Sequence, residues 1–404
     1  MKQLKVILFS TNLAAGGAIT PAIPAYSACV RCSPNKLAAT IFQGVTLLRF
    51  WMGVSCSKHS IRVDPMTTYA TLEDIENCMD NGWTDGLPVI PPYGSLVDAM
   101  LEAMGWQGSD SVGEIPDQNI VVRAEKAAAT AVMAGCKTEY GPLLRALTEG
   151  LLDPKLNLSG VEVTTGGAAV LVIVSGPVVE QLGFEHETNA LGANCRANAT
   201  VGRFAQMMRY FCGRGGGVLQ SHGTIGHPGR LSFCIAEHPK TEWGAYHTQY
   251  GLPETASAIS LMSTEGPNSV NNHYGDTGTH ILDTIGDALC HAGQTAWYYR
   301  SGGFVVVIPP DHMALVAKDF SREQALEYIY KHARRQTDEL AELGRIAKNP
   351  IEFAEVAPGE LRSPLKSREQ LTFIECGSSG GRFSAIIPRW VGSTHAVCRE
   401  IKSV

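Results

Sequence analysis

One cysteine lies where two predicted helices meet. Residues 121–134 are rich in alanine with charged residues at helical spacing, and Gly135 ends the pattern as a left-handed cap does. An N-terminal signature and spaced leucines then predict a second helix. Cys136 is therefore expected before a helix N-terminus and beside Lys137, where the helix dipole and the cation favour a thiolate. The position equally suits an inert cysteine, because free cysteine is often buried.

Two further residue types offer acid–base chemistry. His222 and His227 lie in a glycine-rich stretch, and either is a candidate base for the cysteine. Glu237 follows a predicted strand at 231–236 and is a separate acid–base candidate, whereas Cys234 on that strand is interpreted as core filler. The candidate catalytic residues are therefore Cys136, His227 and Glu237.

Anion binding is predicted from glycine-rich loops and nearby donors. Such loops present backbone N–H groups that can hold a carboxylate or an oxyanion. The loops are residues 164–167 and 213–217, and neither matches a nucleotide-binding fingerprint. The loop 376–381 is a second candidate anion cradle. The candidate substrate-binding residues are Thr164, Thr165, Gly166, Asn198, Arg203, Arg214 and Arg382. Arg203 is expected either to clamp a substrate carboxylate or only to pair with a neighbouring acid. We expect Cys136, His227, Asn198 and Arg203 to converge on one cleft, with residues 164–166 or the loop 376–381 at its wall.

No metal ion or other cofactor is expected from the spacing of ligand types. His273, His280 and His291 lack the i, i+4 spacing of a helical ligand pair. Cys29 and Cys32 form a Cys-x-x-Cys pair, and no second pair completes a zinc ribbon.

The pattern of elements predicts an α/β fold with mixed or mostly parallel sheets covered by helices. We expect strands at 161–165, 168–174, 231–236, 256–262 and 303–308, and helices at 71–79, 95–104, 121–134, 178–182, 198–211 and 321–343. A C-terminal strand pair at 371–375 and 383–388 is expected to pack back on the main body. No internal sequence repeat is apparent.

Composition divides the chain into an extension and a folded region. Residues 1–63 contain lysine and arginine but no aspartate or glutamate, which is typical of a transit or signal segment. Residues 1–65 are therefore interpreted as such a segment, or as a non-native extension before a start at Met66, and are expected to be disordered. Residues 66–404 form the catalytic region, as one body or as two packed lobes at about 66–240 and 241–404.

The charge balance restricts the partners. A formal net charge of −6 and the lack of a long basic run argue against nucleic acid. The apolar run 41–54 is too short to span a bilayer. We expect a small-molecule substrate, a homo-oligomer and a cytoplasmic location, with organelle import if residues 1–65 are genuine.

Four motifs together resemble one family. They are Trp83-Thr84-Asp85-Gly86-Leu87-Pro88-Val89-Ile90-Pro91-Pro92, the run Ala131 to Cys136, the run Ala197 to Arg203, and Gly226-His227-Pro228-Gly229. The region from about Thr71 to Trp390 resembles a group of largely uncharacterised microbial proteins, neighbours of the small selenoproteins with a Sec-Gly-Ser-Cys (UGSC) motif. The resemblance implies thiol or reductive chemistry and a small redox protein as a partner, but it fixes no reaction.

Three hypotheses follow. The first is a cysteine-dependent enzyme acting on a small carboxylate- or carbonyl-bearing substrate, by thiol redox or covalent thiolate chemistry. The second is a metal-independent hydrolase or lyase with Glu237 and His227 as an acid–base pair. The third is a non-catalytic subunit that binds a small redox partner through an exposed apolar patch.

Overall fold

The structure is a computed structural model that describes residues 70–115, 119–192, 195–212, 222–292, 297, 302–346, 359–392 and 395–402. The interpretation of residues 1–65 and the candidate Arg214 lie outside these ranges. The described residues belong to one compact unit, Thr67–Val404. Within them, no helix combines the length and the apolar character needed to cross a bilayer.

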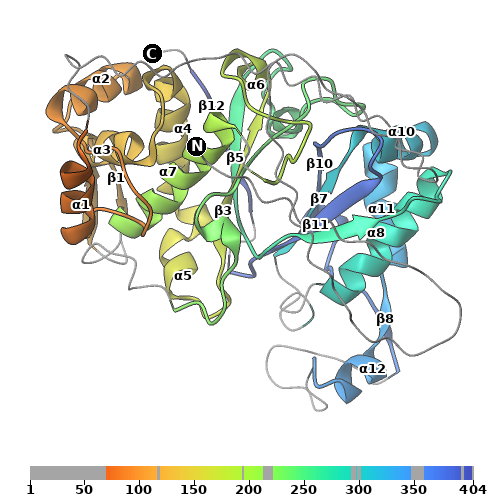
Figure 1. Ribbon diagram of the computed structural model, residues 1–404. Coiled ribbons are helices and arrows are strands. Elements are labelled where there is room, and N and C mark those ends of the chain that lie inside the picture. The colour runs from red at the N-terminus through yellow and green to blue at the C-terminus, as the bar shows by residue number, and fades with distance from the viewer. Residues whose placement is uncertain are drawn as a thin grey trace, which may run out of the picture. The chain divides into compact units, whose positions relative to one another are not determined.

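An eight-stranded mixed sheet is the centre of the described fold, and helices pack around it (Figure 1), which confirms the α/β class. The strand order is β10-β7-β11-β5-β3-β4, with β12 paired to β5 and β6 paired to β11. The strands are β3 (Ala169–Ser175), β4 (Cys234–Ala236), β5 (Ala258–Thr264), β6 (Asn268–Asn271), β7 (Gly303–Ile308), β10 (Leu371–Glu375), β11 (Phe383–Arg389) and β12 (Val397–Glu400). The predicted C-terminal strand pair, β10 and β11, joins this sheet on both sides of β7.

The same strand topology occurs twice in the sheet. In the first half β3 is parallel to β4 and antiparallel to β5, and in the second half β7 is parallel to β10 and antiparallel to β11. Each half also contains one strand that comes from the other half of the chain. Thus β6, which follows β5, pairs with β11, and β12, which follows β11, pairs with β5.

Equivalent main-chain hydrogen bonds occur in the two halves at two places. Where β5 meets β11, Trp390 N donates to Ser263 O and Glu265 N donates to Pro388 O, both at 2.8 Å. At the carboxyl ends of the parallel strands, Glu237 N donates to Val174 O at 2.8 Å and Cys376 N donates to Ile308 O at 3.0 Å. The halves therefore share their hydrogen-bonding pattern without a repeat in the sequence.

Each half of the sheet is covered by its own helices (Figure 1). Helices α3 (Ala124–Ala134), α4 (Gly141–Leu151) and α7 (Arg196–Cys212) pack with one face of β3, and α8 (Gly278–Ala292), α10 (Pro310–Asp319) and α11 (Arg322–His332) pack near β7. The other faces share one apolar cluster, which includes Ile173, Ile235, Met262, Val305, Ile374 and Ile387. Burial on both faces explains why β3 and β7 are continuous apolar runs.

Smaller elements complete the described chain. They are α1 (Leu72–Asp80), α2 (Gly94–Met104), β1 (Ser111–Ile115), β2 (Ile120–Arg123), α5 (Leu158–Val163), α6 (Val178–Gln181), β8 (Arg335–Gln336), α12 (Thr337–Glu342) and β9 (Leu361–Arg362). Strands β1 and β2 pair with each other, as do β8 and β9.

Four predicted elements were wrong in type or extent, and one of them is the strand predicted at 231–236, which begins only at Cys234. Residues 161–165 were expected as a strand, but α5 forms there because the Asn157 side chain accepts Gly160 N and caps the turn. The helix predicted at 121–134 begins only at Ala124, after β2. The helix predicted at 321–343 is interrupted after His332, because β8 pairs with a distant strand.

The glycine that begins α4 lets two helices approach. A Cβ on Gly141 would lie 2.3 Å from the Ala103 carbonyl oxygen of α2. Gly94 begins α2, and nothing lies within 4 Å of its Cβ position. We predict that Gly141→Ala lowers the thermal midpoint by several degrees, whereas Gly94→Ala leaves it unchanged or slightly raised. Equal midpoints for the two variants in thermal unfolding followed by circular dichroism would contradict this packing.

Candidate functional site

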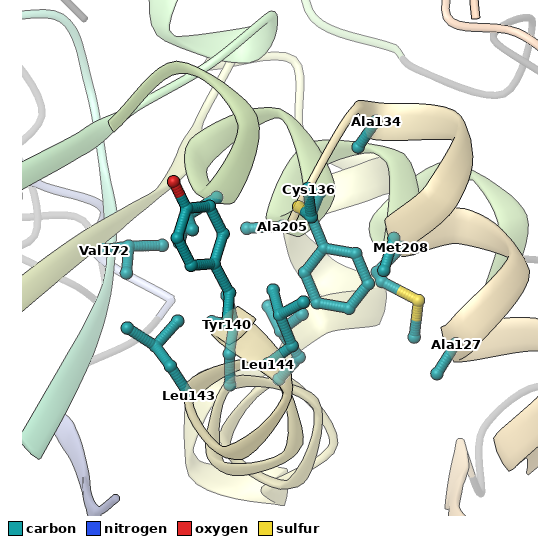
Figure 2. Close-up of a cluster of buried hydrophobic side chains, with 14 of the residues drawn as sticks. Ala127, Ala134, Cys136, Tyr140, Leu143, Leu144, Val172, Ala205 and Met208 are labelled. Atoms are coloured by element: carbon teal, nitrogen blue, oxygen red, sulfur yellow. The ribbon is translucent and has the colours of Figure 1, made fainter. Parts of the chain in front are cut away.

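Cys136 lies inside the apolar core rather than at an open helix end. Gly135 does end α3 in a left-handed conformation, with φ of 87°. A short 3-10 turn, Thr138–Tyr140, then leads into α4. Figure 2 shows the cysteine among Tyr140, Leu144 and Met208, and its thiol donates to the Thr200 carbonyl oxygen at 3.4 Å.

Burial dominates the acidity of this thiol. It raises the pKa of Cys136 to about 12, although the Thr200 contact and the nearby Arg196 and Arg203 lower it in part. The expected thiolate is therefore wrong at neutral pH, because the loss of water around the charge outweighs the helix end.

Arg203 is already paired within the protein. Its Nε and Nη2 donate to the two carboxylate oxygens of Asp85 at 2.8 and 2.7 Å. Ile90 N, in the same segment as Asp85, donates to Met133 O at 3.4 Å. The motif segments 83–92, 131–136 and 197–203 therefore pack together. The guanidinium of Arg203 is used in the contact between the first and the third of them.

Asn198 holds a turn in place. Its side chain accepts Glu185 N at 2.9 Å and donates to Glu185 O at 3.0 Å and to Cys234 O at 3.3 Å. The buried amide thereby fixes the turn at residue 185 against β4. Asn198 is a positioning residue, and all of these partners are main-chain atoms.

The acidity of Cys136 predicts slow alkylation. Cys195 and Cys398 are partly exposed, whereas Cys136 is buried. We predict that iodoacetamide at neutral pH modifies Cys136 more slowly than either of them in the folded protein. A mass-mapped time course measures this, and faster labelling of Cys136 would restore the thiolate interpretation.

Two glycine loops meet at the amino-terminal end of β3. Thr224 N donates to Thr165 O at 2.9 Å, and a Cβ on Gly167 would lie 2.6 Å from the Gly226 Cα. Gly166 N donates to Thr164 Oγ1, which also accepts Trp390 Nε1. The structure therefore brings His227, in the second loop, to the predicted wall of residues 164–166.

Two arginines and one carboxylate lie beneath these loops. Arg209 Nη1 donates to Glu162, and both side chains are buried. The Nε and Nη2 of Arg209 are also buried and have no hydrogen-bond partner among the described residues, and the guanidinium lies 4.3 Å from the centre of the Tyr210 ring. Arg230 Nη1 donates to the Ala168 carbonyl oxygen at 2.6 Å. Burial raises the pKa of Glu162, and the charges of Arg209 and Arg230 lower it in part.

The ring of His227 is held in one tautomer. Its Nδ1 accepts Gly229 N at 3.2 Å, so the neutral ring carries its proton on Nε2. Nε2 is buried and forms no hydrogen bond of good geometry with the described residues, although the Thr264 backbone is close. Burial lowers the pKa of His227, the contact with the Thr264 backbone raises it in part, and the positive charges of Arg230 and Arg209 lower it further. The neutral imidazole is therefore the resting form, with Nε2–H as a donor.

Glu237 lies at the other end of β4 from His227. The His227 ring packs edge-on against Phe233, directly before β4, with ring centroids 5.6 Å apart. Glu237 follows β4 and accepts Tyr246 N at 2.9 Å. About four residues of extended chain, roughly 13 Å, separate these backbone positions. The geometry thus favours separate roles for His227 and Glu237.

The pKa of Glu237 is raised to about 8, mainly by burial and to a smaller extent by the Glu375 carboxylate. The hydrogen bond from Tyr246 N and the charge of Arg322 act in the opposite direction. Glu237 is 3% exposed. The carboxyl is therefore mostly protonated at neutral pH.

Sequence reasoning missed a cluster at this carboxyl end. His186, Glu187 and His238 have ligand atoms that all lie within 4.8 Å of one another. His186 and His238 each follow a glutamate, in Glu185-His186 and Glu237-His238. The repeated Glu-His dipeptide was the available signal, but the two copies lie too far apart in sequence for a spacing rule to join them.

The second predicted anion cradle, residues 376–381, contains an internal carboxylate. Asp311 Oδ2 accepts Gly380 N at 3.0 Å and Arg382 N at 3.1 Å. The Arg382 guanidinium donates to the His273 and Gly275 carbonyl oxygens. Asp311 thus takes the place that a substrate anion was expected to fill.

His222 is exposed, and its N–H donates to Glu162 O at 3.3 Å. A cavity of about 280 Å³ lies elsewhere, lined by residues that include Asp283 of α8, Arg335 of β8 and Glu339 of α12. Arg335 pairs with Glu339, and Asp283 accepts the Tyr328 hydroxyl. These three charged groups therefore already have partners within the protein.

The third hypothesis expected exposed apolar side chains. Such side chains occur at Trp83, Leu87, Ile90, Tyr93 and Leu96, which are 40–51% exposed. The binding of a partner stays a prediction.

No protein-family model matches the chain, and no curated protein is detectably similar to it. The motif resemblance described above therefore stays a prediction.

The lowered pKa of His227 predicts a pH effect on stability. Below its unfolded pKa of about 6.5, the unfolded state binds a proton that the folded state does not, so folding is destabilised as pH falls. In His227→Asn the amide oxygen still accepts Gly229 N, but the side chain does not titrate. We predict that the free energy of unfolding of the wild type falls relative to this variant between pH 7 and pH 5. Urea titrations with parallel pH profiles would contradict it.

Proposed function

We propose that the chain is an enzyme that binds a small carboxylate-bearing substrate at the amino-terminal end of β3. The observation that carries this proposal is the buried guanidinium of Arg209, whose Nη1 donates to Glu162 while its Nε and Nη2 have no hydrogen-bond partner among the residues that the structure describes. A carboxylate supplied by the substrate would accept from these two donors.

Arg209 is the principal anion-binding residue in this proposal. Its Nη1 donates to Glu162, while its buried Nε and Nη2 have no hydrogen-bond partner within the part of the chain that the structure describes. A guanidinium offers parallel donors that match the two oxygens of a carboxylate. Buried donors without partners are costly, so a ligand that satisfies them gains that free energy on binding.

His227 supplies the chemistry in this proposal. Its neutral ring carries the proton on a buried Nε2, and Arg209 and Arg230 make the surroundings positive. A neutral imidazole N–H beside a bound carboxylate can polarise a substrate carbonyl or protonate a leaving group. The reaction class that fits is hydrolysis or lyase chemistry. Thr165 and Gly166 are exposed, which leaves the loops open to a small molecule.

Arg209→Lys tests the binding step. Lysine keeps the positive charge beside Glu162 but loses the donors at Nε and Nη2. Succinate, 2-oxoglutarate and their amides serve as probes in calorimetric titrations of the full chain. We predict that one carboxylate binds, that its amide does not, and that Arg209→Lys weakens its binding about 10- to 100-fold.

Arg203→Lys is the matched control, because Arg203 lies on the same helix but pairs with Asp85. It is expected to leave binding unchanged. For a probe that is turned over, loss of substrate followed by NMR should stop in His227→Asn while binding persists. Equal affinity for acid and amide, or equal effects of the two lysine variants, would refute the proposal.

A further inference from the structure

The cluster at the carboxyl end of β4 lies apart from the proposed substrate site and has a chemistry of its own. The rings of His186 and His238 pack edge-to-face, with centroids 5.0 Å apart and an interplanar angle of 83°. Both histidines are half-buried, and Glu187 beside them is exposed. Two imidazoles and a carboxylate from two chain segments thus share one small space.

Both rings direct the same nitrogen to a backbone carbonyl. His186 Nδ1 lies 3.4 Å from Phe184 O, and His238 Nδ1 lies 3.1 Å from Lys240 O and 3.3 Å from Lys240 N. A carbonyl can only accept, so Phe184 O favours the His186 tautomer with the proton on Nδ1 and the lone pair on Nε2, whereas the two Lys240 contacts are compatible with either tautomer of His238. Metal-ligating histidines usually have this arrangement, with the non-ligating N–H held by a backbone carbonyl or a carboxylate.

The main chain around both histidines is braced against β10. Gly377 N donates to His186 O at 2.8 Å, and His238 N donates to Glu375 O at 2.7 Å. The turn before Glu187 is fixed in addition, because Glu185 Oε1 accepts Glu187 N at 2.8 Å and Thr188 N at 3.0 Å. The Asn198 side chain fixes the main chain of Glu185 with two hydrogen bonds. Ligands positioned by such contacts lose little freedom on binding an ion.

We propose that His186, Glu187 and His238 form a binding site for one divalent transition-metal ion. The ligand atoms lie within 4.8 Å of one another. A tetrahedral ion with bonds of about 2.0–2.1 Å requires roughly 3.3 Å between its ligand atoms. Rotation of the exposed Glu187 side chain brings its carboxylate closer to the imidazoles, and rotation of the two rings about their Cβ–Cγ bonds adjusts the distance between their nitrogens.

The ligand set selects the class of ion. Imidazole nitrogens favour zinc, iron, nickel or copper over magnesium and calcium, which prefer oxygen ligands. Two histidines and one carboxylate occur in catalytic zinc sites and in non-haem iron sites, where an open position receives water or substrate. Three protein ligands here leave such a position. Bound at this place, the ion would supply a Lewis acid or an activated water.

Metal titration of the full chain tests the site. Untagged protein carrying Cys29→Ser and Cys32→Ser is stripped with a chelator and titrated with Zn²⁺ by calorimetry and with Co²⁺ by absorption. We expect one equivalent to bind, with a cobalt spectrum that lacks a thiolate charge-transfer band. His186→Gln and His238→Gln should each weaken binding at least about 100-fold, and Glu187→Gln about 10-fold.

Two control variants and one ligand variant distinguish metal binding at this site from misfolding and from binding elsewhere. His280→Gln, at an exposed histidine elsewhere, should bind the metal as the wild type does. Glu187→Gln changes an exposed side chain and is expected to fold, so it reports on the site even where a histidine variant misfolds. Arg209→Lys should keep full metal affinity, because this site does not depend on carboxylate binding. Binding that is absent, or unchanged in all three ligand variants, would overturn the proposal.

Discussion

The junction between β5 and β11 is the contact on which the rest of the fold depends. Thr264 pairs there with Arg389, and reciprocal main-chain bonds follow on each side of the pair. Thr264 also pairs with Ala169, the first residue of β3, so the glycine loops lie close to this junction. Trp390, the residue after β11, donates to Thr164 from the opposite half. The proposed substrate site is thus built on the seam between the two halves.

Burial decides the chemistry of the titratable groups more than local helix geometry does. A helix end contributes about 0.3–1 kcal/mol, whereas one pKa unit corresponds to about 1.4 kcal/mol. Burial raises the pKa of Cys136 from its ordinary value to about 12, and no helix end compensates such a shift. The same effect keeps His227 neutral and Glu237 protonated, because each charged form would lose its water.

The helices and strands were predicted from the sequence more accurately than the contacts between distant residues. Strands β3, β5, β7, β10 and β11 were found because their apolar runs are long and buried on both faces. The short polar strands β6 and β12 were missed, since their existence depends on neighbours far away in the chain. At the candidate sites, the loops that carry residues 164–166 and His227 meet, whereas Cys136 lies in the apolar core and Arg203 pairs with Asp85. The identity of the acid that pairs with Arg203 could not be predicted, because no local pattern records a partner more than a hundred positions away.

The exchange of outer strands between the halves has a consequence for how the chain folds during synthesis. The first half needs β12, whose Val397 pairs with Leu261 on β5. When β5 leaves the ribosome, the strand that covers its open edge has not yet been made. An open strand edge is a template for pairing with another chain, so the nascent protein carries this hazard until the second half follows. The order of translation, and not only the final packing, therefore limits when the fold can close.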